Sequence, residues 1–159
     1  MKITILCVGK IKEKYFAMGI EEYVKRLSRY CKLEIIEVPD EKTPDNASEA
    51  QNLMIKKKEG EKLLHYIKEG SYPIALAIEG KPLSSVQFAD KIDGLGISGE
   101  SHIIFIIGGS LGLDQGILSI AKEKISFSNM TFPHQMMRMI LLEQIYRGYR
   151  ITMNHPYNK

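Results

Sequence analysis

Five short apolar runs rich in isoleucine and valine recur along the chain and constrain its fold more than any other feature. They lie at Lys2–Val8, Leu33–Val38, Pro73–Ile78, Ile103–Ile107 and Lys124–Phe127. Longer segments with helical spacing of apolar residues separate them. Nearly continuous apolar strands that alternate with helices are typical of a parallel sheet covered on both faces. The pattern therefore predicts an α/β fold, with a parallel sheet and helices on both of its faces.

The length of 159 residues allows one well-filled core, so we expect a single domain over residues 1–159. The longest apolar runs are far shorter than the roughly 18 to 20 residues of a membrane-spanning helix, which excludes membrane proteins of that class. The amino terminus lacks the small-residue cleavage site of a signal peptide. Cys7 and Cys31 are the only cysteines, so we expect inert thiols and a cytoplasmic protein without a disulfide framework.

Three helix starts are marked by residues that cap helices. Ser48 with Gln51, and Ser84 with Gln87, have the capping-box spacing, in which a hydroxyl and an amide satisfy two backbone N–H groups. Asp114 stands where a helix should follow the fourth strand, as a natural N-cap.

The fourth strand ends in a glycine-rich turn, "GGSLGLD", from Gly108 to Asp114. A dinucleotide fold places such glycines after its first strand, and a phosphate loop ends in a lysine that this turn lacks. These absences count against a nucleotide-binding regulator of the flavodoxin type. Asp114 would also repel a phosphate at the following helix. The turn therefore suits backbone contact with a ligand that is not strongly anionic, such as S-adenosylmethionine, or it is simply a tight strand-to-helix connection.

The late segment "FPHQMMRMILLEQIYR" predicts a helix opened by Pro133. From Met136 to Ile145 it is apolar nearly all round, and one sheet cannot cover every face. We therefore expect a homodimer through this helix, with Met137 or Leu141 at the shared face. The polar residues Arg138, Glu143 and Gln144 could pair across the dimer axis.

The last thirteen residues, "RGYRITMNHPYNK", contain Arg147, Arg150 and Lys159 and no acidic residue. Basic side chains interleaved with tyrosines are typical of contact with RNA. No spacing of Cys, His and Asp indicates a metal site, so none is predicted.

Four motifs carry a resemblance that covers the whole chain: "GKPLSSVQFA", "FIIGGSLGLDQ", "FPHQMMRMILLEQIYR" and "NHPY". They closely resemble the small SPOUT-class methyltransferases that modify a pseudouridine of bacterial 23S ribosomal RNA at N3. The resemblance implies a carboxyl-terminal trefoil knot, a homodimer and S-adenosylmethionine as cofactor. It also implies 23S rRNA of the large subunit as substrate, and we expect recognition to need the assembled ribosome.

The resemblance places S-adenosylmethionine among three loops of the knot. Matched by position, the cofactor-binding residues are Leu76, Gly108, Phe127, Ser128, Asn129, Met130, Thr131 and Phe132. Two positions depart from the family pattern. Gln87 stands in place of the usual glutamate, which affects at most a helix cap or an ion pair. Asn158 stands in place of a frequent histidine, which weakens any assignment of proton transfer to the tail.

Four residues near the carboxyl terminus are the candidate catalytic group. Arg147 could stabilise the anion that forms as N3 loses its proton, or bind a phosphate, and its alternative role is an ordinary salt bridge. Tyr157 could stack on a splayed base or merely pack in the dimer. His155 could orient the tail or accept a proton. Lys159 could contact phosphate or simply belong to a frayed chain terminus. His134 is expected to be structural or part of the cofactor wall.

Two other readings stay open. A non-catalytic ribosome-binding or RNA-binding α/β module would use the basic tail alone, and the glycines would form only a turn. A SPOUT methyltransferase that acts on another RNA, such as transfer RNA, is also compatible with the resemblance.

Overall fold

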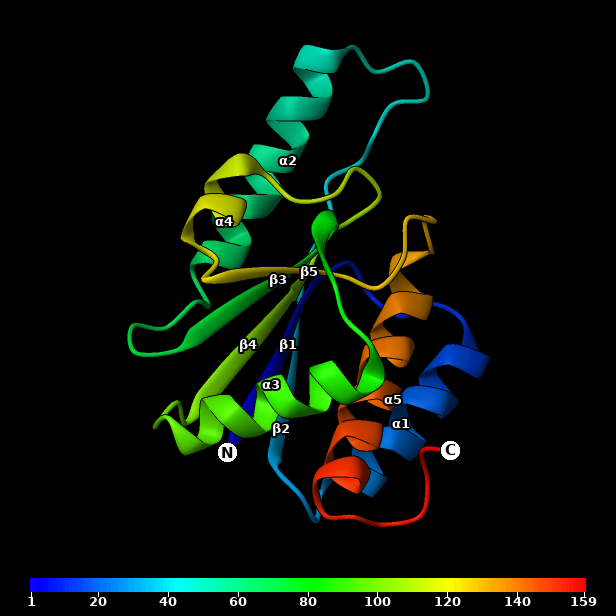
Figure 1. Cartoon of the computed structure of the whole chain (residues 1–159). Coiled ribbons are helices and arrows are strands. Elements are labelled where there is room, and N and C mark those ends of the chain that lie inside the picture. The colour runs from blue at the N-terminus through cyan, green and yellow to red at the C-terminus, as the bar shows by residue number, and fades with distance from the viewer.

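The computed structural model describes residues 1–159 and contains one five-stranded sheet, in which every strand pair is parallel (Figure 1). The strand order is β2-β1-β4-β3-β5. Along the chain the elements are β1 (Lys2–Val8), α1 (Lys14–Leu27), β2 (Lys32–Val38), α2 (Glu49–Leu64), β3 (Tyr72–Pro82), α3 (Ser85–Ile97), β4 (His102–Ile107), α4 (Gln115–Ile120), β5 (Glu123–Ser126) and α5 (His134–Thr152). The predicted parallel α/β architecture is confirmed.

Helices cover both faces of the sheet, as predicted. Helices α2 and α4 lie on one face, and α1, α3 and α5 lie on the other (Figure 1). The central strands contribute side chains to the hydrophobic cores on both faces of the sheet, because successive side chains of a strand point to opposite faces. In β4, Ile103 and Phe105 join the core beneath α1, α3 and α5, whereas Ile104 and Ile106 join the core beneath α2 and α4.

The predicted caps are present. Both capping boxes are complete, with Ser48 accepting from the Gln51 N–H at 3.1 Å and Ser84 accepting from the Gln87 N–H at 3.1 Å. Gln87 therefore caps α3 through its amide oxygen. Burial raises the pKa of the Cys7 thiol to about 12, which makes this thiol inert near neutral pH.

Strand β3 is longer than the predicted Pro73–Ile78, because its end crosses over β5. Both Leu76 and Lys81 pair with Ile125, so residues 77–80 form a bulge between them. A Cβ atom at Gly80 would lie 2.6 Å from the carbonyl carbon of Ile125, which leaves room only for glycine at this crossing.

Helix α5 packs between α1 and α3 of its own subunit (Figure 1). Leu141 is fully buried there, together with Leu142 and Ile145. The prediction that Leu141 faces a partner subunit is therefore wrong, because two helices of the same chain cover that side. Periodicity alone could not show that α1 and α3 flank this helix.

The polar residues of α5 are also satisfied within the subunit. Arg138 pairs with Glu37, Glu143 with Arg147, and Gln144 with Ser85. The expectation that these side chains pair across a dimer axis has no support here, because each already has a partner.

No helix combines the length and apolar character that crossing a membrane requires.

Candidate functional site

A cavity of about 740 Å³ lies at the carboxyl edge of the sheet, where parallel α/β folds place their ligands. Its walls come mainly from the bulge of β3 and from the segments that follow β4 and β5. The volume lies within the range of small-molecule and cofactor sites. The structure brings seven of the predicted cofactor residues into this wall: Leu76, Gly108, Phe127, Ser128, Met130, Thr131 and Phe132. Asn129 is exposed and lies outside the lining.

The glycine turn is both a tight connection and a wall of the cavity. A Cβ atom at Gly108 would lie 2.7 Å from the carbonyl carbon of Gly112, so the fold of the turn itself requires glycine there. Gly112 has a φ of +87° and donates its N–H to the Gly109 carbonyl at 3.1 Å. Asp114 then caps α4 by accepting from the Gly116 N–H at 3.0 Å. The two roles considered for the turn are therefore compatible.

The loop after β5 is held by its own serines. The Ser126 hydroxyl donates to the Ser128 carbonyl at 3.1 Å, and the Ser128 hydroxyl accepts from the Met130 N–H at 2.9 Å. Phe127 packs edge-on against Phe88 of α3, with 5.9 Å between the ring centroids. These contacts hold the loop in place beside α3 and in the cavity wall.

Few charged groups line the cavity. Lys56 of α2 and Glu79 of the β3 bulge are the only Asp, Glu, Lys or Arg residues among its walls. His134 also lines it, and burial together with the nearby Arg138 guanidinium lowers the pKa of this imidazole. His134 is therefore neutral at pH 7, and it lies against Gly9, where an added Cβ would be 3.0 Å from its ring. Its predicted place in the wall matches the geometry.

Sequence reasoning missed Lys56 and Glu79 as wall residues. Lys56 stands in a run of three lysines on α2, which resembles any solvated helix face. Glu79 lies within the bulge in β3, which supplies Ala77, Ile78 and Glu79 to the wall. Neither position carries a local signal in the sequence.

The candidate catalytic residues near the carboxyl terminus form a second cluster. The Arg147 guanidinium binds Glu143 through Nη2 at 2.8 Å and lies 4.6 Å from the Tyr157 ring centroid. Tyr157 donates its hydroxyl to Glu143 at 3.0 Å, and burial and this bond raise the pKa of Tyr157 to about 12. Asn158 accepts from Arg147 at 3.1 Å. The tail is therefore folded onto α5, and Arg147 forms the salt bridge that was the alternative to a role in binding substrate.

His155 and Lys159 are less constrained. The His155 ring nitrogen Nδ1 lies 3.3 Å from a guanidinium nitrogen of Arg150, and its backbone N–H donates to the Arg150 carbonyl at 2.8 Å. Lys159 is exposed and forms no hydrogen bond or ion pair.

Nowhere in residues 1–159 do three His, Cys, Asp or Glu side chains form a group that could hold a metal ion.

The cavity and the tail lie at opposite ends of α5. His134 begins this helix in the cavity wall, and the tail follows its end at Thr152. Nineteen residues at a rise of 1.5 Å make the helix about 28 Å long. The structure therefore does not bring Arg147, His155, Tyr157 and Lys159 to the cavity of their own subunit.

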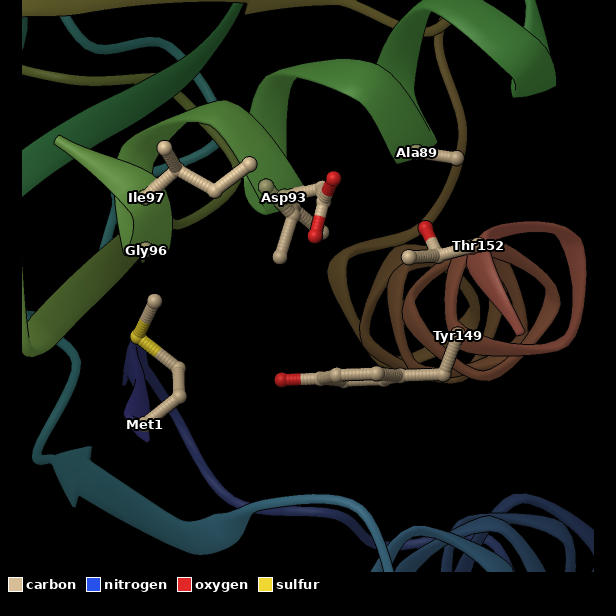
Figure 2. Close-up of a pocket in the computed structure, with 9 residues that line it drawn as sticks. Met1, Ala89, Asp93, Gly96, Ile97, Tyr149 and Thr152 are labelled. Atoms are coloured by element: carbon tan, nitrogen blue, oxygen red, sulfur yellow. The ribbon is translucent and has the colours of Figure 1, made fainter.

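A smaller cavity of about 260 Å³ lies between α3, α5 and the amino terminus (Figure 2). Figure 2 shows the Asp93 carboxylate and the Tyr149 hydroxyl directed into it, beside Met1 and Ile97. None of the residues predicted for cofactor or substrate lines it. The larger cavity is therefore the candidate site.

Comparison with known proteins gives matches over nearly the whole chain. The sequence profile of the family described as "Predicted SPOUT methyltransferase" matches residues 1–158. Proteins from Clostridium novyi (strain NT) and Bifidobacterium adolescentis are each 60% identical to this chain over 159 residues, covering all of both chains. Both are named ribosomal RNA large subunit methyltransferase H.

A solved structure of a probable methylase family protein from Haemophilus influenzae Rd KW20 shares the fold, with a TM-score of 0.54 and 11% identity. The likeness covers 99% of this chain and 70% of that one. The match of the family profile over nearly the whole length, together with the full-length relatives, shows that the chain belongs to the SPOUT methyltransferase family.

Proposed function

We propose that this protein transfers a methyl group from S-adenosylmethionine to N3 of a pseudouridine in 23S rRNA of the large ribosomal subunit. The observation that carries the proposal is the convergence of three separate segments, the bulge of β3 and the loops after β4 and β5, on one cavity. These are the loops to which the family resemblance assigns the methyl donor. The full-length relatives named as rRNA large subunit methyltransferases support the substrate class. Activity on ribosomes also implies a cytoplasmic location.

The cavity suits the methyl donor in size and polarity. Glycine at 108 lets the backbone approach closely, and Leu76 and Phe132 offer apolar contact to an adenosine. The neutral His134 avoids repelling a sulfonium, and Glu79 supplies the single acidic side chain of the wall. When bound, S-adenosylmethionine supplies a methyl group activated by the positive sulfonium, which leaves as a neutral thioether.

The residues of the chain have to align the base and manage one proton. The bond between N3 and the methyl carbon forms as the carbon–sulfur bond breaks, and the N3 proton passes to solvent or to a base. Tyr157, with a pKa of about 12, stays protonated, so it acts by stacking or donation rather than as the base. Hydrogen bonding to Glu143 raises the pKa of Arg147, which keeps its positive charge beside the developing anion.

The distance between tail and cavity supports a composite site in a homodimer. Because the tail lies about one helix length from its own cavity, we infer that it closes the cavity of a partner subunit. Half-buried Met136 and Ile140 of α5, with exposed Tyr15 and Met18 of α1, offer an apolar face for that dimer. The backbone crossing of Gly80 over Ile125 supports a knotted path for the carboxyl-terminal part.

Mass spectrometry of 23S rRNA tests the reaction. A strain without the gene should lack one methyl group on one pseudouridine, and a plasmid copy should restore it. An unchanged rRNA methylation pattern would overturn the proposed substrate. Calorimetry with S-adenosylmethionine tests the non-catalytic alternative, because a binding module would show no heat.

Mixed dimers test the composite site. Subunits with Gly108→Ala lack a working cavity, and subunits with Tyr157→Ala lack a working tail. If sites are shared, half of the randomly mixed dimers carry one intact site of two, and activity recovers to about a quarter of the wild-type value. No recovery would show that each subunit works alone.

A further inference from the structure

The carboxyl-terminal ends of α1 and α5 share a surface rich in arginine and tyrosine. The arginine–tyrosine surface consists of Lys25, Arg26, Arg29, Tyr30, Tyr146 and Arg150. Arg26 lies over the Tyr146 ring at 5.5 Å, and Arg150 donates to the Tyr30 hydroxyl at 3.3 Å. These contacts join the two helix ends into one surface.

Part of the positive charge on this surface has no acidic partner in the protein. Arg26 pairs with Glu22 at 3.2 Å, but no carboxylate lies within 4.0 Å of Lys25, Arg29 or Arg150. Lys25 and Arg29 are exposed. The segment from Lys25 to Lys32, "KRLSRYCK", contains four basic residues and no acidic one. The surface is therefore available to an external anion.

The same surface is continuous with the carboxyl-terminal tail. Tyr146 meets Tyr157 edge-on, with 5.0 Å between the ring centroids, and Arg150 lies 3.3 Å from His155. Any macromolecule that presents a nucleotide to the tail must therefore pass close to Arg150 and to the end of α1.

We propose that the arginine–tyrosine surface binds the phosphates of the rRNA strand that flanks the target nucleotide. This rests on the proposed function and extends it to the docking of the substrate. Single-stranded RNA combines a charged backbone with unstacked bases, which arginine and tyrosine side chains bind together. Phosphate contacts of this kind hold the RNA in register without reading its sequence.

A matched pair of charge reversals tests the proposal. Arg29→Glu changes the arginine–tyrosine surface, and Lys68→Glu makes the same change in charge at an exposed lysine between α2 and β3. Arg29→Glu should raise KM for large ribosomal subunits roughly tenfold. The slope of log KM against the logarithm of the salt concentration should fall by about one. Lys68→Glu should leave both unchanged. The affinity for S-adenosylhomocysteine should be the same in both variants, and Lys25→Glu should act like Arg29→Glu.

The outcomes separate this proposal from the function on which it rests. If the wild-type protein leaves rRNA unmethylated, the proposed function fails. If the wild-type protein methylates rRNA and Arg29→Glu matches Lys68→Glu, only the docking surface is refuted. Dissociation of the Arg29→Glu dimer in native mass spectrometry would also overturn the proposal, because the surface would then be a subunit contact.

Discussion

The guanidinium of Arg138 on α5 forms an ion pair with the carboxylate of Glu37 on β2, although 101 positions separate them in the chain. Arg138 is 1% exposed and also donates to the Gly9 carbonyl at 3.1 Å. The pair ties the start of α5 to the ends of β1 and β2. It thereby holds His134, one turn earlier on α5, in the cavity wall.

Breaking this pair should destabilise the protein. Glu37→Gln leaves the Arg138 charge buried beside a neutral amide, and we expect the free energy of unfolding to fall by about 2 kcal/mol in urea titrations. Glu34→Gln breaks an exposed pair with Lys2 and should cost less than about 1 kcal/mol. If Glu37→Gln and Glu34→Gln lowered the free energy of unfolding equally, the burial of Arg138 would add nothing to the effect of breaking its ion pair.

The glycine turn should tolerate no side chain at 108. In Gly108→Ala the added Cβ would lie 2.7 Å from the Gly112 backbone, so the turn that lines the cavity must change its shape. We expect the affinity for S-adenosylhomocysteine to fall at least about tenfold in calorimetry, which is 1.4 kcal/mol. Gly94→Ala on α3, where an added Cβ meets nothing within 4 Å, should bind normally. Normal binding by Gly108→Ala would place the ligand elsewhere.

His134 should make stability depend on pH. Burial lowers its pKa below the ordinary 6.5, so the unfolded chain takes up this proton before the folded one does. Its contribution to stability is complete above pH 6.5 and is lost as the pH falls from there through the folded pKa. His134→Gln should therefore flatten the stability profile between pH 7.5 and 5.5, measured by thermal unfolding. The same substitution at exposed His65 is the control, and an unchanged profile in His134→Gln would contradict the assignment.

The apolar face of α1 and α5 should hold the dimer. Met18 is 70% exposed on α1, and Met18→Glu places a charge within that face, so we expect monomers in sedimentation experiments. Those monomers should bind S-adenosylhomocysteine but methylate no rRNA. Ile97→Glu, at a residue 79% exposed on α3, should remain dimeric and active. An active Met18→Glu monomer would remove the basis of the composite site.

Local sequence signals predicted the parts of the fold that depend on neighbouring residues. The capping boxes at Ser48 and Ser84, and the N-cap at Asp114, form as the spacing indicated, because each uses contacts within three residues. The apolar runs became strands, although β3 runs on to Pro82. That extension depends on pairing with β5, which no pattern within β3 reveals.

The sequence by itself determined the alternation of strands and helices, the glycine turn and, through its motifs, the family to which the chain belongs. Tertiary structure decided which faces of α5 are free, because α1 and α3 pack against α5 and bury Leu141. It also decided that Lys56 and Glu79 join the cavity, and that the tail lies a helix length from it. Periodicity describes one element at a time, whereas burial and distance arise only when distant segments pack together.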